Sequence, residues 1–91
     1  MKKYVFTLYI AGQGNVNKTA IQNLTSLCKT YLKNSYNLTI IDIEEHPELA
    51  EKNKILAIPT LIKELPEPVQ KYIGNLSDKN DLKIDLGLDN V

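Results

Sequence analysis

The chain has little of what marks a disulfide-stabilised, membrane-spanning or nucleic-acid-binding protein. It contains one cysteine, so no disulfide can form within the chain. Its basic residues are all lysines, which excludes bidentate recognition of phosphate or guanine by arginine. No apolar run approaches the roughly 20 residues that a membrane-spanning helix needs, and no signal peptide is evident. These absences predict a cytoplasmic protein without a nucleic-acid or membrane partner.

An excess of charge is also missing. Eleven Asp and Glu residues balance eleven lysines, so no bulk field draws the chain to an acidic or basic partner. The 91 residues contain no repeat or linker and predict a single domain, 1–91. A domain of this size buries a modest fraction of its surface, so self-association would help to stabilise it.

The N-terminal half predicts a β-α-β unit. Residues Tyr4–Ala11 are nearly all apolar or β-branched, which is typical of a buried central strand. Asn17 is expected to cap a helix that ends at residues 33–35, and a second strand is predicted at Leu38–Ile43. The helix carries one broad apolar stripe formed by Ala20, Ile21, Leu24, Leu27, Cys28, Tyr31 and Leu32.

The middle of the chain resembles the middle of a thioredoxin-like domain. A short acidic helix is predicted at Pro47–Lys52, with proline at its first position, and Ile58-Pro59-Thr60 then opens an apolar run. In thioredoxin-like domains the proline of such a motif is usually cis and lies beside the active site. Here no Cys-x-x-Cys follows the first strand, where the chain reads Gly12-Gln13-Gly14. A thioredoxin-like frame without a dithiol predicts a binding or switching protein.

The last third of the chain fits two templates. Residues 60–65 can be a strand or a helical turn, and residues 68–74 can be a helix capped by Gly74 or a strand. In residues 78–89, Ser77 or Asp78 can cap a helix that presents Leu82 and Leu86. The alternation of Leu82, Ile84, Leu86 and Leu88 with polar residues fits a strand equally well. Gly87 would cost a helix interior about 1 kcal/mol relative to alanine, which favours the strand.

Several motifs together resemble the KaiB family. The similarity extends over residues 4–86 without an evident gap. A proline-rich segment beside a Lys-Ile-Leu-Ala-x-Pro-Thr-Leu run distinguishes this family from ordinary thioredoxins. The matching motifs are Leu8-Tyr9-Ile10-Ala11-Gly12, Ile41-Asp42, Pro47-Glu48-Leu49-Ala50-Glu51, Lys54-Ile55-Leu56-Ala57-Ile58-Pro59-Thr60-Leu61, Leu65-Pro66-Glu67-Pro68-Val69 and Ile73-Gly74-Asn75-Leu76-Ser77.

The resemblance implies an α/β protein with two folds. The family's resting fold, β-α-β-β-α-α-β, assembles as a dimer of dimers. A rarer thioredoxin-like monomer, β-α-β-α-β-β-α, binds partners. Such a switch needs two packings that differ by only a few kcal/mol. The alternation in residues 82–88 favours the resting tetramer as the form that a structure would show.

The resemblance also implies a regulatory protein that is not an enzyme and has no cofactor. The family's partner is KaiC, a hexameric RecA-like ATPase whose phosphorylation cycle it slows or redirects, in a circadian clock or a stress-adaptation module. Cyanobacterial members then sequester KaiA and displace a thioredoxin-like sensor kinase domain. A KaiC-like ATPase, a sensor histidine kinase and further copies of the chain are therefore the expected partners.

Two groups of residues carry over from the family. Lys54, Lys63 and Lys71 stand at basic positions on the family's partner-binding side. A cis/trans change at Pro59, Pro66 or Pro68 would make the switch slow, on the order of tens of seconds or longer. The chain departs from the family pattern at Asn15, Thr19, Glu67, Gln70, Asp85 and Gly87, and it lacks the acidic tail of many members.

Two other residues, Cys28 and His46, are of types found in redox and metal sites, but simpler structural interpretations explain them. Cys28 lies on the apolar stripe and is expected to be a small buried hydrophobe rather than a reactive thiolate. His46 lies among glutamates, where capping and helix-dipole complementarity explain the pattern better than a metal site does. Two alternative functions stay open: a thioredoxin-like sensor or interaction domain of a two-component system, and a monothiol oxidoreductase.

Overall fold

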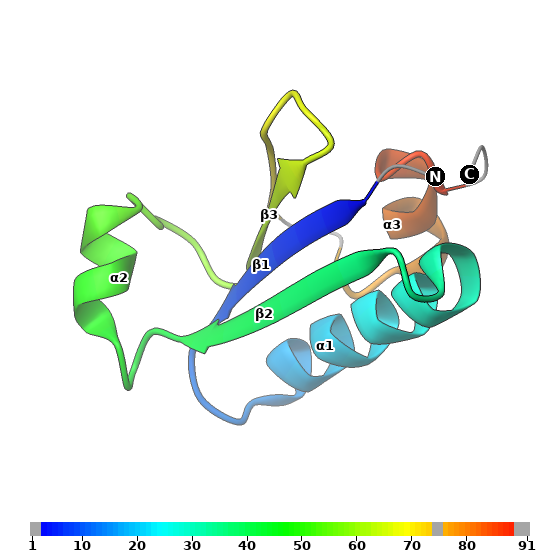
Figure 1. Ribbon diagram of the computed structural model, residues 1–91. Coiled ribbons are helices and arrows are strands. Elements are labelled where there is room, and N and C mark those ends of the chain that lie inside the picture. The colour runs from blue at the N-terminus through cyan, green and yellow to red at the C-terminus, as the bar shows by residue number, and fades with distance from the viewer. Residues whose placement is uncertain (1–2, 74–75, 89–91) are drawn as a thin grey trace.

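The computed structural model describes residues 3–73 and 76–88. Its elements follow the order β-α-β-α-β-β-α, the second of the two orders that the resemblance implies (Figure 1). The first helix continues directly into a π-helical turn, η1. The elements are β1 (Tyr4–Ile10), α1 (Asn15–Leu27), η1 (Cys28–Leu32), β2 (Tyr36–Asp42), α2 (Pro47–Lys52), β3 (Thr60–Leu65), β4 (Gln70–Ile73) and α3 (Lys79–Asp85).

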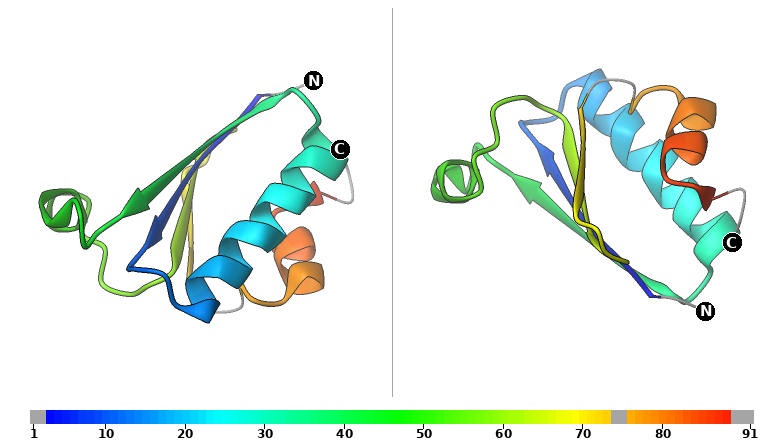
Figure 2. Two further views of the ribbon diagram at one scale, coloured as in Figure 1. Left: turned by 90° about the horizontal axis from the view of Figure 1, so that it is seen from below. Right: turned by 90° about the horizontal axis from the view of Figure 1, so that it is seen from above.

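One four-stranded sheet in the order β2-β1-β3-β4 organises the molecule. β1 and β2 run parallel, joined by α1, whereas β3 is antiparallel to β1 and β4 is antiparallel to β3. Figure 2 shows α1 and α3 together on one face of the sheet, with α2 beyond its end. The described residues place no helix over the opposite face, which we call the open face.

The hydrophobic core lies between the sheet and the layer of α1 and α3. Phe6 and Leu8 from β1, Leu24 and Leu27 from α1, and Leu61 from β3 are almost completely buried there. Each such side chain stabilises the fold by about 1.5–3 kcal/mol relative to an exposed one. The core therefore holds α1 and the sheet together.

The predicted β-α-β unit is confirmed, with one correction at the start of its helix. β1 and β2 lie within two residues of their predicted bounds, whereas the helix of α1 and η1 begins three residues before its predicted start. Asn17 is not the N-cap, since the helix begins at Asn15 after Gly14. The Asn17 side chain is buried and its Nδ2 donates to the Ala11 carbonyl at 2.7 Å, which ties the helix to the end of β1.

The ambiguous segments at residues 60–65 and 68–74 both contain strands. β3 covers the first, and β4 takes residues 70–73 of the second. The alternative in which Gly74 caps a helix falls partly outside the described residues. No helix of the described chain is both long and apolar enough to cross a bilayer.

The preference for a strand over residues 82–88 was wrong for this structure, where α3 takes its place. Leu82 and Leu86, one turn apart, are buried, whereas Ile84 is 56% exposed. Asp78 is the N-cap, and its Oδ1 accepts from the Asp81 N–H at 3.0 Å. Gly87 lies just after the helix at φ +69°, with its N–H bonded to the Ile84 carbonyl, so it ends the helix rather than weakening it.

The expectation that a structure would show the resting order was therefore wrong as well. The difference lies in the C-terminal half, where β3, β4 and α3 replace the resting arrangement. Tertiary packing decides it: a helical turn buries Leu82 and Leu86 in the same core as α1. An alternating sequence pattern by itself does not show that Leu82 and Leu86 are buried together in a helix.

Candidate partner-binding surface

The open face of the sheet is the first candidate surface. Since side chains alternate along a strand, the neighbours of the core residues Leu8, Leu61 and Tyr72 point to this face. The pairing sets Thr7 opposite Ile62, and Ile62 opposite Lys71. Ile73, at the end of β4, leaves 58% of its side chain exposed. The open face thus combines apolar side chains with an exposed lysine.

Glu64 supplies the negative charge on this face. The Thr7 hydroxyl donates to Oε1 of Glu64. Oε2 of Glu64 is buried and has no hydrogen-bond partner among the described residues. Burial, and then the charge of Glu64, raise the pKa of Tyr9 above its usual value. Sequence reasoning missed Glu64, because a glutamate in an apolar strand does not reveal which face it takes.

The three lysines expected at the partner surface take three different positions. Lys71 is exposed on the open face. Lys54 is exposed in the α2–β3 loop, residues 53–59, with φ +55°. Lys63 points to the helix-covered side, is 7% exposed, and donates from Nζ to the Pro66 carbonyl at 2.6 Å. In this fold, then, Lys54 and Lys71 are accessible and Lys63 is held inward.

The α2–β3 loop also exposes an apolar side chain. Leu56 is 95% exposed, the most of any large apolar residue described. A leucine this exposed offers apolar contact area to a partner, and the charge of the neighbouring Lys54 can steer an acidic one. Sequence reasoning missed Leu56 as a candidate because an apolar residue leading into a strand is normally expected to be buried. The motif around Lys54 was the available signal.

The prolines expected to take part in switching border the third strand. Pro59 is buried just before β3, and Pro66 and Pro68 lie in the loop between β3 and β4. The peptide bonds that precede all three are cis. The Thr60 hydroxyl donates to the Ala57 carbonyl at 2.6 Å, which holds the end of the α2–β3 loop against β3.

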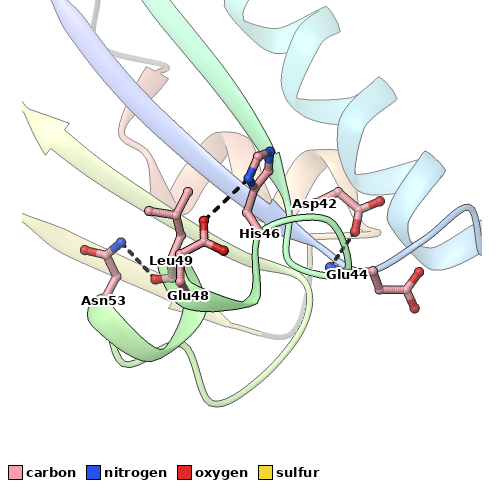
Figure 3. Close-up of polar contacts among 6 residues, drawn as sticks. All are labelled: Asp42, Glu44, His46, Glu48, Leu49 and Asn53. Atoms are coloured by element: carbon pink, nitrogen blue, oxygen red, sulfur yellow. Dashed lines mark hydrogen bonds and ion pairs between the residues drawn. The ribbon is translucent and has the colours of Figure 1, made fainter.

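The acidic segment before α2 is held by backbone N–H groups that donate to Asp42 (Figure 3), and the expected side-chain capping is not observed, since the N-cap residue His46 makes no such hydrogen bond. The Oδ1 atom of Asp42 accepts from the backbone N–H of Glu44 at 2.9 Å and of Gly12 at 3.2 Å. His46 Nδ1 lies 3.6 Å from Glu48 Oε2, and both side chains are mostly exposed. Among the described residues, no three His, Cys, Asp or Glu side chains converge as a metal site would require.

Cys28 has the environment of a structural residue. It is completely buried in η1, and burial raises the pKa of its thiol to about 12. A reactive cysteine needs a thiolate at neutral pH and access to solvent. The interpretation of Cys28 as a small buried hydrophobe is confirmed.

Comparison with known proteins decides the family. The KaiB domain family matches residues 7–88 of the chain. The chain belongs to the KaiB family. The circadian clock oscillator protein KaiB of Picosynechococcus sp. is 47% identical over 88 residues, covering 97% of this chain and 83% of the relative. The circadian clock protein KaiB3 of Synechocystis sp. is 45% identical over 91 residues, covering 100% of this chain and 87% of the relative.

Solved structures confirm the thioredoxin-like fold of this KaiB-family chain. The N-terminal domain of Synechococcus elongatus SasA has a TM-score of 0.73 at 19% identity, covering 100% of this chain and 90% of that one. The germline-specific thioredoxin Deadhead of Drosophila melanogaster has a TM-score of 0.75 at 20% identity, covering 99% and 83%. At these identities the likeness concerns the fold alone.

Proposed function

We propose that the chain is a regulatory protein, not an enzyme, that binds a KaiC-like RecA-fold ATPase and modulates its phosphorylation and ATPase cycle. Membership of the KaiB family, whose matched relatives are named as circadian clock proteins, is the observation that carries the proposal. The setting is a circadian clock or a stress-adaptation module.

The exposed chemistry of this fold supports binding rather than catalysis. The turn after β1 contains glycine, glutamine and asparagine where a thioredoxin would need a nucleophile. Lys54 and Leu56 lie together in the α2–β3 loop, and Lys71 lies on the open face. Burial of Leu56 against a partner would provide affinity, and the charges of Lys54 and Lys71 would steer the chain toward an acidic partner.

The proposal includes a change of fold and self-association. The thioredoxin-like arrangement is the binding form. The resting form is a dimer or tetramer in which each chain has the order β-α-β-β-α-α-β. Pro59, Pro66 and Pro68 are proposed to take part in the switch because the family resemblance implies that they lie in the half that rearranges. In this binding form Lys63 is proposed to act by holding the β3–β4 loop, while Lys54 and Lys71 face the partner.

Co-sedimentation with the purified KaiC-like ATPase of the same cell tests the proposal. We expect Leu56→Ser and Lys54→Ala each to weaken binding by about tenfold or more, as centrally placed anchor residues do. The matched controls are Val16→Ser and Lys18→Ala, exposed residues of α1 on the helix-covered side. Absence of binding by the unmodified chain after long incubation would contradict the proposed partner.

A second candidate function is an interaction or sensor domain of a two-component system. The likeness in fold to the SasA domain favours it over an oxidoreductase. A chain of this kind would stay monomeric with one fold at every concentration and would bind a histidine kinase rather than the ATPase. A monothiol oxidoreductase would require insulin reduction that is lost in Cys28→Ser, and burial of Cys28 opposes it.

A further inference from the structure

Charge is strongly segregated along the chain, although it sums to zero. The first 41 residues contain five lysines and no aspartate or glutamate, so every acidic side chain lies from Asp42 onward. α1 and η1 fall within the basic part and therefore form a helical surface with no carboxylate of its own. Such a surface attracts anions wherever it offers them a place to bind.

A groove between the C-terminal half of α1, with η1, and the neighbouring α3 offers such a place. Its volume is about 280 Å³, and it is lined by Leu27, Thr30, Tyr31, Lys79, Asn80 and Lys83. Lys79 and Lys83 are four residues apart, so both side chains lie on one face of α3. Leu27 and the ring of Tyr31 add an apolar wall.

The ammonium groups at this groove are oriented by side chains of α1 and η1. Lys79 Nζ donates to the Ser26 hydroxyl at 2.7 Å, and Lys83 Nζ lies 5.9 Å from the centre of the Tyr31 ring. Among the described residues, no carboxylate lies within the 4.0 Å of Lys79 Nζ that an ion pair requires. The positive charge of Lys79 is thus positioned but not neutralised.

No aspartate of α3, nor its N-cap Asp78, lines the groove. Asp78 caps the helix through the Asp81 N–H. Asp85 acts on the other side of α3, where burial and then its charge raise the pKa of Tyr72. The two sides of this short helix therefore differ in sign, with lysines toward α1 and an aspartate toward β4.

We propose that the groove between α1, η1 and α3 binds a small organic phosphate, with the phosphoryl group at Lys79 and Lys83 and an apolar body against Leu27 and Tyr31. Lysine binds phosphate as a point charge, and the hydroxyl of Thr30 and the amide of Asn80 can donate further hydrogen bonds. The groove is near the lower end of the range for small-molecule sites, which begins at about 300 Å³. A compact phosphate monoester suits that size better than an extended acidic peptide.

Occupation of the groove would favour this fold. The site exists only while residues 79–85 are helical and packed against α1, so a ligand stabilises this arrangement over any in which they form a strand. This consequence rests on the proposed fold change, whereas the site itself does not. Because the groove lies on the helix-covered side, it leaves the open face accessible.

Titration of the full chain with phenyl phosphate, followed by NMR, tests the site. We expect saturable shifts at the amides of Tyr31, Asn80 and Lys83. Lys79→Gln and Lys83→Gln should each weaken binding by about tenfold or more, since each removes a contact to a charged group. Lys18→Gln is the matched control, because Lys18 is exposed on α1 about 14 Å along the helix axis from Leu27.

Two other probes decide between sources of the anion. Equal affinity for inorganic phosphate would overturn the role of the apolar wall, and tighter binding of a hexaglutamate peptide would overturn the small-molecule assignment. Absence of saturable shifts with phenyl phosphate in the folded chain would overturn the site. None of these titrations involves the ATPase, so failure here and failure of the proposed partner are distinguishable.

Discussion

At the scale of the residue, a lysine can support a fold as well as expose a charge. Lys63 and Lys71 lie in adjacent pairs of the ladder between β3 and β4 but on opposite faces of the sheet. The family resemblance grouped them as basic positions on one partner-binding side, where a lysine is normally exposed. The strand alternation separates them, and the long stem of Lys63 lies against the core while its ammonium reaches the Pro66 carbonyl.

Replacement of Lys63 tests this difference. Lys63→Met keeps the stem but leaves the Pro66 carbonyl without its donor, so we expect a loss of about 1–3 kcal/mol in the free energy of unfolding. Lys71→Met, on the exposed face, is the matched control and should change stability by no more than about 0.5 kcal/mol. Urea unfolding measures both, and equal effects would contradict the inward role of Lys63.

Cys28 gives a prediction for alkaline pH. Its thiol has a folded-state pKa of about 12, above the ordinary pKa of 9.0, so the unfolded chain loses this proton first as pH rises. The stability that depends on the neutral thiol is complete below pH 9 and is lost as pH rises toward about 12. Unfolding at a series of pH values should show this loss, and Cys28→Ala should decline less steeply. A thiol reagent should modify native Cys28 only after unfolding.

At the scale of the element, α3 is where two sequence patterns competed. Residues 82–88 alternate as a strand would, yet Leu82 and Leu86 also lie one helical turn apart. The sequence contained both patterns, including the cap at Asp78. The sequence alone could not decide between helix and strand, because the choice depends on which side chains pack into the hydrophobic core.

Leucine and isoleucine truncations in α3 distinguish the two arrangements. In the helix, Leu82→Ala should cost about 2–5 kcal/mol and Ile84→Ala about 0.5 kcal/mol or less, because Leu82 alone of these two is buried. In a strand both would point to the same face and share a similar cost. Thermal or urea unfolding of the two variants measures the difference.

The start of α3 allows a second test with a close control. Asp78→Ala removes the side-chain acceptor of the Asp81 N–H and should destabilise the fold by about 1 kcal/mol. Ser77→Ala changes the neighbouring residue that the sequence offered equally well as a cap, and should have little effect. A larger effect from Ser77→Ala would place the helix start one residue earlier.

At the scale of the whole molecule, the open face and the exposed α2–β3 loop leave apolar surface uncovered. Val69, Ile73 and Leu56 are all largely exposed in a chain of 91 residues. A small domain with such surface gains stability by association. The proposed resting assembly would provide that cover.

Sedimentation across a range of concentrations, with NMR of the dilute sample, tests the assembly. We expect a tetramer or dimer at high concentration and, on dilution, a monomer with the fold described here, by mass action. Slow exchange between two sets of NMR signals would support the proposed change of fold. A single thioredoxin-like monomer at every concentration would contradict it and favour the interaction-domain function.

The sequence by itself determined the family, the β-α-β unit, the helix at Pro47–Lys52 and the burial of Cys28. Each of these features depends on a local pattern or a sequence motif, which can be recognised without knowing the tertiary contacts. The tertiary structure decided the rest: the helical state of residues 79–85, the inward position of Lys63 and the groove beside Lys79. Each of these depends on contacts between segments far apart in the chain, and a periodic pattern records only which side chains are apolar, not what they will pack against.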